Sequence, residues 1–320
     1  MLRRCFASLS LLAVLLHGTA AHADEADFAK WVENFKEEAV KAGISQPVID
    51  AAFTGLEPDD AVIQLDQKQP ENKLTLEQYL HNTINARRIH KGREMLAFYA
   101  EPLKRISQKY GVQPKYIVAL WGIESDYGQH PGNFSVVRSL ATLAYEGRRA
   151  ELFSKELVSA LAIIEAENIA PEELTGSWAG AMGGCQFMPS TYRTYAADGN
   201  GDGKRDIWKT PEDVFASVAN YLHNLGWNPA QQWGGAAVAD DDFSDDIDKA
   251  RSGHYWSKHG VSFTSGAKPK DEEQFYAITV GSDGDAYLVS ENFKALLNWN
   301  RSRYFAAAVG TLADAIGDEE

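Results

Sequence analysis

The stretch Ala119-Leu120-Trp121-Gly122-Ile123-Glu124-Ser125-Asp126-Tyr127-Gly128 places one carboxylate, that of Glu124, among apolar residues near the expected end of a helix. Gly111 is typical of the residue that follows a helix. Pro114 suits the first turn of the next one, because it lacks an N–H and its φ is already set. Apolar residues at helical spacing predict a helix over 114–126 that stops by Gly128. Glu124 is therefore expected in the last turn, where burial and the negative end of the helix dipole both disfavour its ionised form.

The chemistry expected of Glu124 is that of a general acid, since protonating a glycosidic oxygen requires a carboxyl that stays neutral near neutral pH. An exposed or salt-bridged glutamate at a helix end is equally consistent with this stretch alone, because perturbed carboxylates also occur in structural networks. Asp126 is the nearest second carboxylate, but residues i and i+2 do not face each other on a helix. We expect a structural role for Asp126, and a second catalytic carboxylate from elsewhere in the fold stays open.

The N-terminus has the pattern of a secretory signal peptide. A short basic region precedes an apolar run too short to span a bilayer, and Ala21-His22-Ala23 is a typical cleavage signal. We therefore expect a signal peptide over 1–23 and a mature chain over 24–320 that is soluble in the periplasm. Cys5 has no apolar region before it, so it is not a lipobox cysteine and no stable membrane anchor is expected.

Net charge limits the classes of partner, and the cysteine content limits disulfide formation. The chain carries a formal charge of −14, which becomes −16 once the signal peptide is removed. This balance argues against nucleic acid as a partner and is neutral toward a glycan. Cys185 is the single cysteine of the mature chain, so no intrachain disulfide can form, and we expect a buried, inert thiol.

Helical periodicity dominates the rest of the chain. Expected helices span about 28–43, 47–53, 75–89, 93–109, 114–126 and 149–168. Thr75 with Gln78 has the spacing of a capping box. Residues 275–280 and 286–290 are strand-like and separated by turn residues, which predicts a β-hairpin. The segment 236–272 is rich in Asp, Gly and Ser and is expected to be a loop-rich insertion in a single, mainly α domain.

An Asp-rich loop carries the first half of an EF-hand pattern. Asp198, Asn200 and Asp202 place oxygen ligands at positions 1, 3 and 5, a glycine follows at 6, and Lys204 offers its carbonyl at 7. Position 12 is Lys209 in place of the usual glutamate. Flexible oxygen ligands suit calcium better than magnesium, and the alternative is an Asp/Gly turn that binds no ion.

Further blocks follow the glutamate stretch in a fixed order. They are residues 139–145, 148–151, 176–183, 186–190, 217–222, 226–227, 287–289, 292–293 and 298–302. Together with 121–128 they resemble the membrane-bound lytic murein transglycosylase B family over about residues 30–316. The resemblance implies a mainly helical, lysozyme-like (α+β) fold. It also implies an enzyme that cleaves the bond between N-acetylmuramic acid and N-acetylglucosamine of peptidoglycan.

In that family one glutamate performs both proton transfers, and Glu124 matches it. It protonates the glycosidic oxygen and then takes the proton of the C6 hydroxyl, which closes onto C1 and leaves a 1,6-anhydro sugar. The acetamido group of the substrate stabilises the developing positive charge, so no nucleophilic carboxylate is needed. The resemblance further implies substrate contacts from Arg148, Arg149, Ser177, Gln186, Tyr221 and Asn300.

The chemistry of these residues agrees with sugar binding. The Gln186 amide both donates and accepts hydrogen bonds, and the Tyr221 ring can stack on a sugar face. Trp299 stands where relatives commonly have tyrosine, so we expect a hydroxyl contact to be lost there while stacking survives.

The paired arginines have two interpretations. Arg148 and Arg149 suit the lactyl or peptide carboxylates of murein through bidentate pairing. The alternative is a helix-surface pair that bridges to Glu146 or Glu151.

The resemblance also supplies the missing calcium ligand, because relatives place the closing carboxylate at the position that Asp213 matches. The expected structural Ca²⁺ site is then formed by Asp198, Asn200, Asp202, Lys204 and Asp213.

We therefore expect a lytic transglycosylase that acts on peptidoglycan with Glu124 as its sole acid and base. Two alternatives stay open: a muramidase that hydrolyses the same bond with water, and a catalytically silent murein-binding scaffold. The presence of Glu124 and Gln186 argues against the scaffold.

Overall fold

The computed structural model describes residues 25–68, 74–239, 246–280 and 285–317. The expected signal peptide over 1–23 and its cleavage signal lie outside these residues. The described chain is mainly helical with small β-sheets, which confirms the expected fold class.

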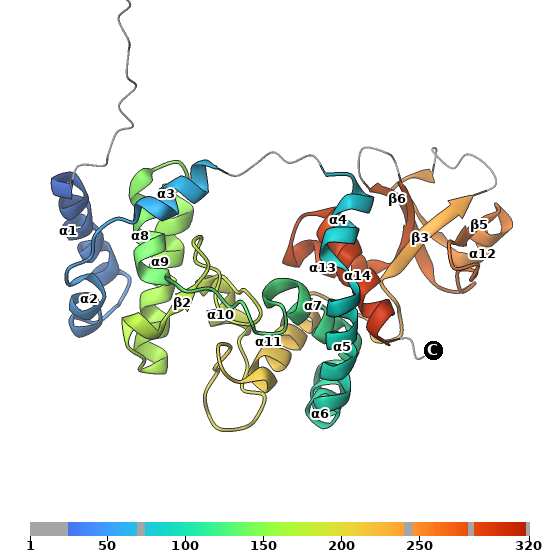
Figure 1. Ribbon diagram of the computed structural model, residues 1–320, viewed down its shortest axis with the longest axis horizontal. Helices are drawn as coiled ribbons and strands as arrows, with labels where there is room; N and C mark the ends of the chain where they lie inside the picture. The colour runs from blue at the N-terminus through green and yellow to red at the C-terminus, as the bar shows by residue number, and fades with distance from the viewer. Residues whose placement is uncertain (1–24, 69–73, 240–245, 281–284, 318–320) are drawn as a thin grey trace, which may run out of the picture.

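Two groups of helices flank a central one (Figure 1). The N-terminal group contains α1 (Glu25–Lys41), α2 (Gln46–Phe53), α3 (Asp60–Gln67), α8 (Val136–Glu146) and α9 (Ala150–Glu167). The central group contains α7 (Pro114–Ser125), α10 (Pro189–Tyr195) and α11 (Pro211–Asn224). The third group contains α4 (Leu76–Thr83), α5 (Ala86–Phe98), α6 (Ala100–Tyr110), α13 (Glu291–Trp299) and α14 (Arg303–Gly317). One hydrophobic core runs through all three groups.

The boundaries of the α4–α6 region differ from those expected. The capping box of Thr75 and Gln78 is present, as predicted. The helix that follows stops at Thr83, because Asn85 accepts the backbone N–H of Arg88 and starts α5 as a new helix. The expected helices over 75–89 and 93–109 are therefore three shorter ones.

Antiparallel strands form a sheet of five beside the third group, in the order β4-β6-β7-β3-β5 (Figure 1). Its strands are β3 (Gly234–Ala239), β4 (Ala250–Ser252), β5 (Val261–Phe263), β6 (Gln274–Val280) and β7 (Asp285–Val289). The predicted hairpin is confirmed in β6 and β7, where Tyr276 pairs with Val289. A second, two-stranded sheet pairs β1 (Phe134–Ser135) with β2 (Thr175–Gly176), and the 3₁₀ turn η1 (Pro171–Glu173) directly precedes β2.

The segment 236–272, expected to be a loop-rich insertion, contains short strands and a helix in the part that is described. This segment supplies most of β3, all of β4 and β5, and the helix α12 (Gly253–Lys258). Trp256 is fully buried against β5 and β6 in a small separate core with Val261 and Phe275. The Asp-rich composition did not predict this structure, because its strands are too short to show clear periodicity.

Helix α7 lies in the middle of the molecule and is buried on nearly all sides. Seven consecutive residues, from Tyr116 to Gly122, are buried, and α5, α11 and α14 pack around them. A helix that is apolar all round belongs in a core. This packing fixes α7 and therefore the position of the carboxylate in its last turn.

Candidate active site

Glu124 occupies the last turn of α7, as predicted. Its side chain is half-buried, and the indole Nε1–H of Trp299 donates a hydrogen bond to its Oε1 at 2.6 Å. Burial raises the pKa of the carboxyl from 4.5 to about 7, and the hydrogen bond from Trp299 opposes that rise. A carboxyl with this pKa can both give and take a proton near neutral pH.

Asp126 is a structural residue, as the sequence predicted. It caps α7 in the left-handed conformation (φ 51°) and is buried. Arg87 donates to its Oδ2 at 2.7 Å, and the guanidinium of Arg88 lies 3.6 Å from its Oδ1. Burial alone raises the pKa of Asp126, but the two arginines outweigh it and hold the pKa below its usual range. Asp126 is therefore ionised and bound to α5.

Gly122 is required because the chain folds back onto α7 after Asp126. The hydroxyl of Tyr127 donates to the carbonyl of Arg88 at 2.7 Å, which holds the tyrosine ring against the helix. A Cβ placed on Gly122 would lie 2.6 Å from that ring, inside van der Waals contact. The glycine two residues before the glutamate therefore allows the turn that orients it.

Gly122→Ala is expected to destabilise the protein by about 1–2 kcal/mol through overpacking against Tyr127. Thermal or denaturant unfolding of the two proteins measures the difference. The double variant with Tyr127→Leu is the control, since removing the ring should remove most of the penalty for the alanine. Equal penalties with and without the ring would contradict this explanation.

Ser125 ties the end of α7 to the loop that carries Gln186. Its hydroxyl donates to the carbonyl of Gly184 at 2.7 Å and accepts the N–H of Gly128. Cys185, in the same loop, is fully buried, and burial raises the pKa of its thiol, as expected for an inert cysteine.

Two aromatic rings pack against Trp299, whose indole contacts the Glu124 carboxyl. The Trp299 ring packs at 5.2 Å from Phe187 and at 4.9 Å from Tyr221, measured between centroids. Trp299 has no hydroxyl, but its indole N–H reaches the carboxylate directly. The sequence drew attention to this position but did not reveal the contact, since Trp299 lies 175 residues from Glu124.

Ser177 and Gln186 are chain neighbours of Gly176 and Phe187, which form isolated β-bridges with Met182. The Gln186 amide Nε2 donates to the carbonyls of Pro131 and Gly183. Its side-chain oxygen has no hydrogen-bond partner among the described residues. The Ser177 hydroxyl accepts the N–H of Ala181 and closes a turn.

Comparison with known proteins decides the family. Residues 27–314 match the family described as the transglycosylase SLT domain. This chain belongs to that family. It is similar to membrane-bound lytic murein transglycosylase B of Escherichia coli (strain K12), with 34% identity over 227 residues. That alignment covers 68% of this chain and 61% of the relative, so the chain spans about three fifths of the relative's length.

Two solved structures support the same assignment. SltB3 from Pseudomonas aeruginosa in complex with NAG-anhNAM-pentapeptide superposes with a TM-score of 0.85 at 40% identity, covering 91% of this chain and 79% of that chain. Escherichia coli lytic transglycosylase Slt35 in complex with calcium gives a TM-score of 0.76 at 30% identity, covering 89% and 92%. The resemblance drawn from the sequence blocks is confirmed.

The paired arginines of this SLT domain bind the carboxylate of Asp66, which lies outside the sequence motifs. Arg148 and Arg149 both donate to Asp66 of α3, which is 2% exposed. The expected alternative partner Glu146 accepts only the backbone N–H of Arg148, and Glu151 pairs with Lys155. The pair therefore fixes α3 to the corner between α8 and α9.

Asn300 follows Trp299 at the C-terminal cap of α13 and is exposed. Its side-chain oxygen accepts the N–H of Ser302. Its amide N–H groups have no partner among the described residues.

Side-chain oxygens stabilise the Asp-rich loop of the SLT domain by accepting hydrogen bonds from its backbone N–H groups. Asp198 accepts the N–H groups of Gly201 and Gly203, which lower the pKa of its carboxyl. Asp213 accepts the N–H groups of Gly199 and Asp206 and so joins the two ends of the loop. Asp213 is fully buried, and burial raises the pKa of its carboxyl.

The loop fits calcium in the kind of ligand that it offers. No group of three His, Cys, Asp or Glu in the described chain is arranged to hold a metal. The oxygens of Asp198, Asn200 and Asp202 nevertheless come from one tight loop, and Asn200 accepts the N–H of Asp202. Within the described residues no Lys, Arg or His pairs with the buried Asp213, whose oxygens accept backbone N–H groups.

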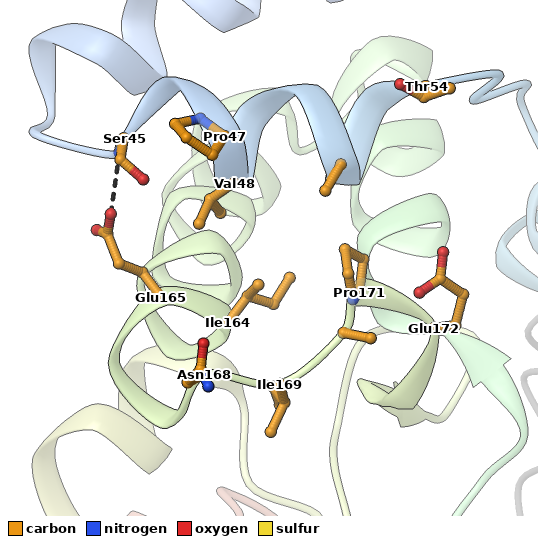
Figure 2. Close-up of a pocket in the computed structure, with 12 residues that line it drawn as sticks. Ser45, Pro47, Val48, Thr54, Ile164, Glu165, Asn168, Ile169, Pro171 and Glu172 are labelled. Carbon is orange, nitrogen blue, oxygen red and sulfur yellow. Dashed lines mark hydrogen bonds between the residues drawn. The ribbon is translucent and has the colours of Figure 1, made fainter.

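A groove of about 810 Å³ lies elsewhere, between α2 and the C-terminal end of α9 (Figure 2). Glu165 lies at its edge and accepts the backbone N–H of Ser45 at 3.2 Å. None of the residues predicted to be functional lines it. The perturbed carboxyl of Glu124 lies outside this groove.

Proposed function

We propose that this protein is a lytic transglycosylase that cleaves the β-1,4 bond between N-acetylmuramic acid and N-acetylglucosamine in peptidoglycan, with formation of a 1,6-anhydro end. The observation that carries the proposal is the Glu124 carboxyl with its pKa near 7. The name of the similar protein of Escherichia coli and the anhydro sugar bound to SltB3 support the same reaction.

A single carboxylate performs both proton transfers in this proposal. Protonated Glu124 donates to the glycosidic oxygen while the bond from that oxygen to C1 breaks. The resulting carboxylate then accepts the C6 hydroxyl proton as the C6 oxygen bonds to C1, which restores the acid. Asp126 is unsuited to be a second catalytic carboxylate, because both of its oxygens face arginines.

Mass spectrometry of murein digested by the purified protein tests the reaction. We expect muropeptides that end in 1,6-anhydro-N-acetylmuramic acid and contain no oxygen from labelled water. Reducing ends that carry the label would mean hydrolysis by a muramidase. Binding without any cleavage would mean a silent scaffold.

Substrate contacts extend the proposal to Ser177, Gln186, Tyr221 and Asn300. The Gln186 oxygen and the Asn300 side-chain N–H groups, which have no partner among the described residues, suit the hydroxyl and acetamido groups of the sugars. The Tyr221 hydroxyl already donates to the carbonyl of Asn298, so its ring is the part that is free to contact a sugar.

The arginines can serve the substrate only with the N–H donors that Asp66 does not take. Each guanidinium has five N–H donors, and the Arg148 and Arg149 side chains are 52% and 42% exposed. We therefore include both in the proposed binding of murein carboxylates.

We also propose that calcium binds the loop through Asp198, Asn200, Asp202, Lys204 and Asp213 and has a structural role. The calcium complex of Slt35 supports this proposal. The ion would hold the connection between α10 and α11 in place.

Removal of calcium is expected to lower the melting temperature and leave the reaction intact. An ion bound only by the folded state, at about 100 times its Kd, stabilises that state by about 2–3 kcal/mol. Calorimetry with and without a chelator measures the loss. Asp198→Asn should melt at the lower temperature and no longer respond to the chelator. Lost activity in a chelated protein that remains folded would place the ion in the reaction.

We further propose that the protein acts in the periplasm after cleavage of its signal peptide. In the described residues no helix is long and apolar enough to cross a membrane. The mature protein is expected to begin at Asp24 without a lipid, which intact-mass measurement checks. A lipid mass or a retained leader would contradict this location.

A further inference from the structure

Trp299 is held in one orientation by its neighbours. Its ring packs against both Phe187 and Tyr221. The Tyr221 hydroxyl donates at 2.9 Å to the carbonyl of Asn298, the residue before Trp299. Phe187 and Tyr221 also contact each other, with centroids 5.8 Å apart. The backbone and the ring are therefore both fixed, and the indole N–H is directed at Glu124.

We propose that Trp299 is a positioning residue that assigns separate tasks to the two oxygens of Glu124. The inference rests on the proposed function. An indole nitrogen donates a hydrogen bond and cannot accept one. Oε1 of Glu124, which receives that bond at 2.6 Å, must therefore act as acceptor whether the carboxyl is protonated or not. The transferable proton is left on Oε2.

This assignment keeps one oxygen in use throughout the reaction. The O–H bond of Oε2 breaks as its proton moves to the glycosidic oxygen, which keeps the electron pair of the broken bond to C1. Oε2 then takes the C6 hydroxyl proton as that oxygen bonds to C1. A tyrosine hydroxyl at position 299 would both donate and accept, and so would permit the proton on either oxygen.

Other titratable groups near Glu124 do not compete for this role. Tyr79 of α4 and Cys185 interact electrostatically with the carboxyl. Burial raises the pKa of both, so they stay neutral while Glu124 titrates. Asp126 is ionised and neutralised by Arg87 and Arg88.

Trp299→Phe tests the inference, because it removes the donor and keeps an aromatic ring. We expect kcat on soluble murein fragments to fall about tenfold or more, with KM little changed. The pH at which kcat/KM declines should rise by about one to two units, since a hydrogen bond to a charged group is lost. Trp208→Phe is the matched control, because its indole donates to the carbonyl of Thr175 and not to Glu124.

A spectroscopic measurement decides the point without relying on the activity of a variant. The indole N–H resonance of Trp299, assigned from its loss in Trp299→Phe or Trp299→Tyr, should shift with pH at the midpoint of the kcat/KM decline. It should stay constant in Glu124→Gln. A resonance that ignores pH in the wild type, or a Trp299→Phe profile identical to that of the wild type, overturns the inference.

A failure of the proposed function would give different results from a failure of the positioning role. In that case the wild type would release no anhydro ends, or Glu124→Gln would remain active, whatever Trp299 does. If the wild type makes anhydro ends and Glu124→Gln is inactive, the Trp299 measurements test the positioning role alone.

Discussion

Glu124→Gln is expected to reduce murein cleavage by at least about 100-fold, because general acid–base catalysis contributes about 10²–10⁴-fold. Glutamine has nearly the same shape, and its carbonyl oxygen can still accept the indole N–H of Trp299. It can neither give nor take the proton. Initial rates of anhydro-muropeptide release from purified murein measure the effect.

The control for this variant is Glu101→Gln, the same substitution at an exposed residue of α6. It should keep wild-type activity. Murein binding by Glu124→Gln should also persist, since the rings and Gln186 are untouched. A Glu124→Gln protein that retained more than about a tenth of the wild-type rate would remove Glu124 from the catalytic role.

The same substitution is expected to stabilise the protein at neutral and alkaline pH. The pKa of Glu124 is about 7 in the folded protein, against 4.5 for an ordinary glutamate. Below 4.5 the carboxyl is protonated in both states and the pKa difference has no effect. As pH rises from 4.5 toward 7, the unfolded chain loses this proton first, which favours unfolding. At about pH 8 the cost to the wild type reaches about 3 kcal/mol.

Glutamine carries no such cost, so the difference in unfolding free energy between the two proteins should grow with pH. Denaturant unfolding at about pH 4.5 and about pH 8 measures it. We expect nearly equal stabilities at the lower pH and a more stable variant at the higher pH. A difference independent of pH would show that the carboxyl is not perturbed.

The sequence predicted those features that depend on neighbours along the chain. Gly111 adopts the left-handed conformation (φ 71°) expected after a helix, and Pro114 begins α7. The capping box of Thr75 formed as predicted. Each is set by backbone geometry within one or two turns, where residue type and spacing suffice.

The sheet around 236–272 could not be predicted from the same kind of pattern. Its strands β4 and β5 have three residues each, too few to show alternation. They are stabilised by pairing with β6 and β3 and by the buried Trp256, which are tertiary contacts. Local composition therefore gave the wrong expectation there.

The sequence by itself predicted the carboxyl that we propose as the acid, its place in the last turn of α7, and a structural role for Asp126. Only the tertiary structure determined which side chains contact Glu124, Asp126 and the Arg148–Arg149 pair. Trp299 contacts Glu124 across 175 residues of sequence. Arg87 contacts Asp126 across 39 residues. Asp66 contacts Arg148 and Arg149 across 82 and 83 residues. Helical spacing extends over a few residues, whereas burial and hydrogen bonding to a carboxylate depend on what the whole fold packs against it.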